Sequence, residues 1–156
     1  MAYSFGDIVR TGTPVPVIVY NNAASAYSAP AAGDPVGYDS SGDLIIAVNT
    51  TDGPLGMLTN LSQTISSVVY YGVLMWGVGI MQCGATAIKP NKFVSVNSSS
   101  LVTPTTTTVS TAFVQGDIQA LWRVLGQYLY IDGDNQFNPS DAASTNKIAV
   151  FVGYRP

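Results

Sequence analysis

Histidine and glutamate are both absent from this chain of 156 residues, and only 10% of its residues are charged. Without histidine, the chain lacks the commonest general base and the commonest metal ligand of proteins. The chain has nine aspartates and a total of six lysines and arginines, which gives a net charge of −3. No basic run is present, so we expect no binding to nucleic acid. Because 47% of the chain is nonetheless hydrophobic, the composition predicts a protein that packs against other proteins.

Disulfides, membrane helices and secretion signals are also lacking. The single cysteine, Cys83, has no partner for an intrachain disulfide, and we expect it to be a small buried hydrophobic residue. The longest apolar run, Val68 to Met81, is shorter than the roughly 20 residues of a membrane helix and contains three glycines. Its β-branched and aromatic content predicts a buried pair of strands. The N-terminus has no basic start followed by an apolar segment, so we expect neither a signal peptide nor membrane association.

Helix signals are nearly missing, whereas short β-rich segments bounded by turn residues recur. One short helix is conceivable, around Val114–Leu121. Asp39–Gly42 and Asn97–Ser100 have the composition of hairpin turns. The sequence therefore predicts an all-β fold, a single small β-barrel or sandwich. The expected strands are Val15–Tyr20, Pro35–Tyr38, Leu44–Val48, Leu55–Thr59, Ser67–Met75, Phe93–Asn97, Trp122–Ile131 and Ile148–Gly153.

Residues 1–32 differ from the rest, because they contain prolines, alanines and isolated aromatic residues. Pro14 and Pro16 exclude a central strand and favour an edge strand or a polyproline-like path. Such a segment cannot build its own core. We interpret it as an extended N-terminal arm that covers the edge of its own sheet or reaches a neighbouring subunit. Its apolar anchors would be Tyr3, Phe5, Ile8, Val9, Val17 and Tyr20.

Residues 33–156 are expected to form one β domain. A weak internal echo links a unit that begins at Gly33 to a second unit that begins at Asn91. Each unit has an entry strand, a polar turn, a strand containing Leu-Gly and a closing strand that ends in glycine. The echo is compatible with two similar β lobes, although β-hairpins also resemble one another by chance.

Four short patterns between Gly33 and Val73 resemble the decoration, or cement, proteins of tailed-virus heads. They are Gly33-Asp-Pro-Val36, the turn Asp39-Ser-Ser-Gly42, Pro54-Leu-Gly56, and the spacing of Val68 with Gly72-Val73. The resemblance implies a β-tulip-like domain that sits, usually as a homotrimer, on the outer surface of the virion. Its partner there would be the major capsid protein, contacted by the N-terminal arm.

The sequence contains only weak candidates for catalytic or metal-binding sites. Asp132, Asp134, Asn135 and Asp141 could supply oxygens to calcium, but an ordinary turn explains the same residues. The other aspartates lie in turn contexts, and no histidine is present to activate a serine. Trp76 and Trp122 would fill the core or an interface, and a sugar site is the more distant alternative. The sequence therefore predicts no enzyme and no cofactor.

These observations together favour a structural virion protein that decorates and stabilises a capsid shell. One alternative is another viral structural subunit, such as a tail-tube, spike or minor shell protein. A second alternative is a carbohydrate-binding β module.

Overall fold

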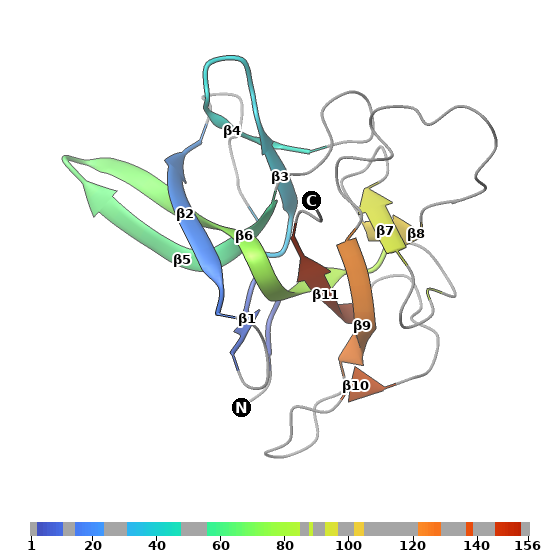
Figure 1. Ribbon diagram of the computed structural model, residues 1–156. Helices are drawn as coiled ribbons and strands as arrows, with labels where there is room; N and C mark the ends of the chain where they lie inside the picture. The colour runs from blue at the N-terminus through green and yellow to red at the C-terminus, as the bar shows by residue number, and fades with distance from the viewer. Residues whose placement is uncertain are drawn as a thin grey trace.

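The computed structural model describes residues 3–10, 15–23, 31–47, 56–84, 88, 93–96, 102–104, 122–128, 137–138 and 146–153. Within these ranges all regular structure is β strand, and no helix occurs (Figure 1). The strands pair antiparallel throughout. The predicted all-β class is therefore confirmed. The possible helix at Val114–Leu121 lies outside the described residues.

In the described part of the chain, eleven strands form one continuous network, whose main path runs in the order β4-β3-β5-β6-β11-β9-β7-β8. Strands β1 and β2 pair with β6 beside this path, and β10 pairs with β9. The strands are β1 (Ile8–Val9), β2 (Val17–Asn22), β3 (Pro35–Tyr38), β4 (Leu44–Ile46), β5 (Gly56–Ile65), β6 (Val68–Gln82), β7 (Phe93–Val96), β8 (Val102–Pro104), β9 (Trp122–Tyr128), β10 (Phe137–Asn138) and β11 (Lys147–Val152).

Strand β6 is the centre of the fold, because its 15 residues serve two groups of strands. Its first part lies between β5 and β2, and its last part lies between β11 and β1. Between the two parts, Gly77 has a φ of +135°, a value that side chains rarely allow. The pairing of β2 with β6 also shifts register at this bend. The expected pair of strands in Val68–Met81 is therefore wrong: one bent strand spans the run.

The start of the chain is built into the same sheet. Strand β1 pairs Ile8 with Gly79, and β2 runs along β6 as far as the pair of Asn22 with Tyr70. Among the described residues, β2 has no ladder on its other side, so it is the edge strand that the prolines predict. Beyond β2, a single parallel bridge joins Ala23 to Leu44 of β4.

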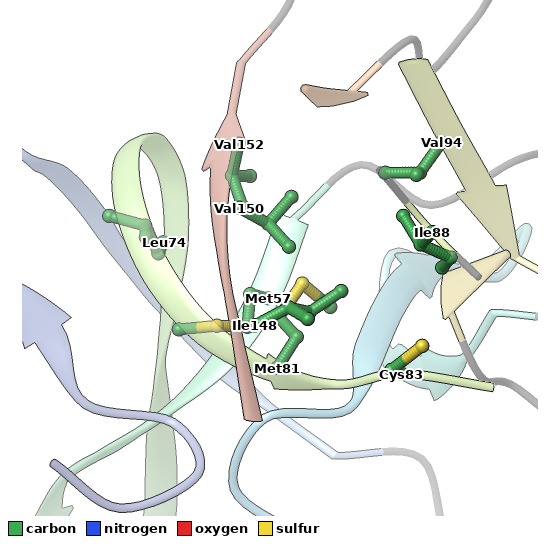
Figure 2. Packing of buried hydrophobic residues seen from close by; sticks show 9 residues of the cluster. All are labelled: Met57, Leu74, Met81, Cys83, Ile88, Val94, Ile148, Val150 and Val152. Atoms are coloured by element: carbon green, nitrogen blue, oxygen red, sulfur yellow. The ribbon is translucent and has the colours of Figure 1, made fainter. Parts of the chain in front are cut away.

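Among the described residues, three clusters of buried side chains lie along the bent strand. The largest gathers residues from β5, β6, β7 and β11, together with Cys83 and Ile88 (Figure 2). Cys83 is fully buried there, as its apolar context predicts. A second cluster lies around Val78 and Ile80, and a third lies under the β3–β4 hairpin around Leu44 and Leu58. Burying each such side chain contributes roughly 1.5–3 kcal/mol relative to leaving it in water.

The turn predicted at Asp39–Gly42 is confirmed by its hydrogen bonds. The Asp39 carboxylate accepts the backbone N–H groups of Ser41 and Asp43 at 2.8 and 2.9 Å. Gly42 has a φ of +82°, and Tyr38 and Leu44 pair on either side of the turn. Residues 97–100 lie outside the described ranges, but the strands before and after them, β7 and β8, pair antiparallel as a hairpin requires.

Candidate interaction surface

Several large apolar side chains are exposed to solvent. Most of them belong to the segment that includes β2, or to the end of the β5–β6 hairpin; the other is Ile46 of β4. The set is Val15, Val17, Val19, Tyr20, Ile46, Ile65, Val68 and Val69, and Val15 is the most exposed at 84%. Single exposed apolar residues are ordinary, whereas a group of them on adjoining strands marks a surface that contacts another molecule.

The β5–β6 hairpin extends beyond the body of the protein (Figure 1). At its tip, Ser66 and Ser67 have φ values of +49° and +67°, which a type I′ turn requires at both central positions. All residues from Ser62 to Val69 are exposed, so neither face of this ribbon is covered by described residues. A two-stranded ribbon is only marginally stable in water. The exposed end therefore has the character of a segment that is completed by contact with a partner.

The register places part of the apolar set on one face. Residues that pair directly across an antiparallel ladder project from the same face, and this face alternates along each strand. Ile65 pairs with Val68, and two residues further along β6 Tyr70 pairs with both Gln63 and Asn22. The next position on this face, Gly72, pairs with Tyr20. Ile65, Val68, Tyr70 and Tyr20 therefore form a stripe from the tip toward the core.

Charge is absent from this part of the chain. No aspartate, lysine or arginine occurs between Gly56 and Gln82, and none occurs in β2. Exposed edge strands usually carry a charge or a proline that discourages pairing with other chains. The lack of such residues from Leu61 to Ile65 leaves this edge open to pairing.

Of the six predicted N-terminal anchors, four contact the chain's own core. Val9 is 1% exposed and belongs to the cluster around Val78 and Ile80, against which Tyr3 and Phe5 pack. Ile8 packs against the large cluster that contains Met57 and Leu74. Burial within the chain leaves Val9 no surface for another subunit.

The other two anchors, Val17 and Tyr20, are exposed, at 51% and 39%. Both lie on β2, next to the exposed residues Val15 and Val19. Among the described residues of the arm, the large apolar side chains open to a partner therefore lie on this strand and at Val15 just before it. Sequence reasoning identified Val17 and Tyr20 but missed Ile65, Val68 and Val69, because an apolar run resembles core unless its glycine bends and hairpin length are known.

An open depression of about 300 Å³ lies where the N-terminal turn meets β5. Its lining includes Asp7 and Arg10 from the turn region, and Asn60 and Leu61 from β5. The Asp7 carboxylate accepts Ser4 N–H and Asn60 Nδ2, both at 2.5 Å. These contacts hold the turn against a bulge in β5, where Asn60 and its neighbours have no pairing partner on β6.

Features that would support catalysis or metal binding are few. The described residues contain no group of three potential metal ligands among histidine, cysteine, aspartate and glutamate. Burial raises the pKa of the Asp34 carboxyl, and a backbone hydrogen bond from Ala31 acts in the opposite direction. The calcium candidates Asp132, Asp134, Asn135 and Asp141 lie outside the described residues. In the part of the chain that is described, no helix is long and apolar enough to cross a membrane.

Trp76 has a packing role. Its ring meets Phe151 edge to face, with centroids 4.9 Å apart and planes at 83°. A Cβ added at Gly153 would lie 2.6 Å from the Trp76 ring, so the absence of a side chain there admits the indole. This half-buried ring matches the expectation of a packing residue better than that of an exposed sugar platform.

Comparisons with known proteins give no relative. No protein-family model matches the sequence, and no curated protein or solved structure matches it significantly.

Proposed function

We propose that this chain is a structural virion protein that decorates a capsid shell and stabilises it through contacts between subunits. The observation that supports this proposal most directly is the uncharged, partly apolar surface formed by β2 and the β5–β6 hairpin. The sequence resemblance to decoration proteins implies that the assembly is a viral capsid and that the partner is the major capsid protein. The chain would act on the outer surface of the virion.

The mechanism is binding and needs no reaction. A protein that binds the assembled shell, but not its separated subunits, stabilises the assembly by mass action. Apolar side chains such as Val17 and Val19 would lose water when a shell protein covers β2. The low charge of the chain limits the repulsion between many copies on one particle.

The exposure of its apolar side chains supports β2 as the docking part of the described arm. Val9 is buried, and Tyr3, Phe5 and Ile8 pack against the chain's own core, so these residues would mainly position the arm. Val17 and Tyr20 would make the contact.

The test is cosedimentation of the purified chain with shells of its own virus from which this chain has been removed. The double variant Val17→Asp/Tyr20→Asp should keep the thermal stability of the wild type and lose most of its shell binding. The matched control, Ser40→Asp/Ser41→Asp, places two charges on the exposed end of the β3–β4 hairpin and should bind normally. Equal binding by both double variants would contradict the proposal.

A second candidate is a self-assembling structural subunit, such as a tail-tube, spike or minor shell protein. The exposed, uncharged edge of β5 favours it, because such an edge can pair with another copy. This candidate predicts that the chain alone forms rings or closed shells in electron micrographs. The decoration proposal predicts small species that need a shell to assemble on.

A further inference from the structure

We propose that the outer edge of β5, from Leu61 to Ile65, pairs antiparallel with the same edge of a second copy, across a two-fold axis at Gln63. The inference rests on the proposed function, since it specifies the self-association that a decorating protein uses. It names the strand, the register and the residue on the axis.

The edge is available for pairing. On its outer side, β5 pairs with β3 only through Gly56 and Met57. The N-terminal turn then reaches Asn60, whose backbone N–H donates to the Gly6 carbonyl at 3.3 Å. Beyond Asn60, no described strand borders this side of β5, and Ser62 to Ile65 are exposed.

The turn at the tip determines which backbone groups face outward. In a type I′ turn, the carbonyl of Ile65 accepts the N–H of Val68, so this pair is a hydrogen-bonded pair. Hydrogen-bonded and non-hydrogen-bonded pairs alternate along an antiparallel ladder. The pairs of Thr64 with Val69 and of Ser62 with Tyr71 are then non-bonded, and the N–H and C=O groups of Ser62 and Thr64 point to the open edge.

The sequence of this edge reads the same in both directions by chemical type. It runs apolar, hydroxyl, amide, hydroxyl, apolar, in Leu61-Ser-Gln-Thr-Ile65. In a two-fold pairing centred on Gln63, Ser62 faces Thr64 of the other copy, so the outward backbone groups of both strands meet. Leu61 faces Ile65, and the two Gln63 side chains meet each other. Like chemistry faces like at every position, which favours cross-strand pairs.

The depression described above lies at the inner end of this edge, because Asn60 and Leu61 help to line it. In the proposed register the strand pairing ends where Leu61 meets Ile65, because Gly6 already occupies the edge at Asn60, and Ser66 of the second copy comes next to this contact. The partner's Ser66–Ser67 turn therefore arrives at the depression, where Asp7 and Arg10 offer polar groups to its hydroxyls. The absence of charge in β5 removes the like-charge repulsion that would oppose two identical edges. A second copy of this chain therefore fits both the uncharged edge of β5 and the depression at its inner end.

One pair of short strands makes a small interface, so we expect the pairing to be weak in free solution. Copies held on one shell have a high effective concentration, which strengthens a weak contact without new interactions. A two-fold contact does not build the homotrimer that the resemblance implies. It would link copies in pairs, or join neighbouring trimers.

Disulfide trapping tests the register. Gln63→Cys places two thiols at a non-bonded pair, where Cα atoms lie about 4.5 Å apart, within the range of a disulfide. Ser62→Cys is the matched control, because its two copies would lie about 8 Å apart, beyond that range. Ser41→Cys, on the exposed β3–β4 turn, measures random collision. The three variants are oxidised with glutathione at the same concentrations, and Cys83 is buried in all of them.

The expected result is a covalent dimer for Gln63→Cys at least about tenfold more abundant than for either control. A mixture of Ser62→Cys and Thr64→Cys chains should give a mixed disulfide, since these positions face each other. Equal trapping at positions 41, 62 and 63 would overturn the proposal. As a measurement on the unmodified chain, the amide protons of Ser62 and Thr64 should exchange more slowly as concentration rises; a rate independent of concentration up to millimolar protein would also overturn it.

The two proposals fail separately. A chain that is trapped at Gln63 but does not bind shells would contradict the decoration function and leave the pairing intact. A chain that binds shells but is not trapped at Gln63, in solution or on the particle, would contradict the pairing alone.

Discussion

The Nζ atom of Lys147 donates a hydrogen bond of 3.0 Å to the backbone carbonyl of Tyr3, and so joins residues 144 positions apart. The same ammonium group lies 5.5 Å from the centre of the Phe5 ring. Lys147 begins β11, so the N-terminal turn is fastened to a strand of the central sheet. The first described residues are therefore part of the folded domain, and the exposed large apolar residues among the described residues of the predicted arm are Val15 and, on β2, Val17, Val19 and Tyr20.

Replacing this lysine should loosen the N-terminal turn. Lys147→Met keeps the aliphatic stem but removes the donor and the charge, and we expect a loss of about 1 kcal/mol in unfolding free energy. Lys147→Arg, which keeps a charged donor, should lose less. Urea denaturation followed by circular dichroism measures both. Unfolding at the same urea concentration for all three proteins would show that the contact contributes nothing to stability.

The six N-terminal anchors should separate into two groups. Val9→Asp would put a charge into a site that is 1% exposed, so the chain should fail to fold or lose several kcal/mol. Val17→Asp changes a residue that is 51% exposed and should change stability by less than about 0.5 kcal/mol. Thermal unfolding distinguishes the two. A similar melting temperature for both variants would mean that β1 is not packed as described.

Gly153 should not tolerate a side chain. The added Cβ of Gly153→Ala would approach the Trp76 ring to 2.6 Å and the Phe151 ring to 3.0 Å. The rings form a packed pair, so relief requires repacking, which costs about 1–3 kcal/mol. Gly42→Asn is the control, because nothing lies within 4 Å of that Cβ and asparagine tolerates a positive φ. The stability measured by denaturation and the tryptophan fluorescence should both change for Gly153→Ala, and neither should change for Gly42→Asn.

Asp34 should make stability depend on pH. Burial raises the pKa of its carboxyl in the folded chain, so the folded state binds this proton more tightly than the unfolded state. The contribution of this group to the unfolding free energy is fully present below the ordinary aspartate pKa, and it is lost as pH rises through the raised pKa. Asp34→Asn should therefore be more stable than the wild type at neutral pH, and the difference should vanish in acid. Urea titrations across this range measure it; a difference that grows in acid would contradict the assignment.

The β class and many strand positions could be predicted from the sequence, because turn residues bound short β-branched segments. Pro35–Tyr38 is observed as predicted, and the Asp39 turn follows from its own side-chain hydrogen bonds. These are local effects, so local sequence carries the information. The short strands β1 and β10 have two residues each, which is too few for a periodic pattern in the sequence. They are strands because they pair with the longer strands β6 and β9.

The exposed surface was harder to predict. Strand β5 extends to Ile65, six residues beyond the expected end at Thr59, and the missed part forms the hairpin edge. Its polar residues Ser62 and Gln63 read as a loop, since pairing with Tyr71 and Tyr70 depends on the partner strand. Likewise, Val68 and Val69 read as core. Only the bend at Gly77 and the length of the hairpin show that they project from the body.

The most direct test of the central claim is an electron cryomicroscopy map of native virions that contain this chain. The account predicts that the chain lies on the outer surface of a larger shell protein, with Val17 and Tyr20 of β2 at the contact. A map that places the chain in the tail or inside the shell would contradict the account.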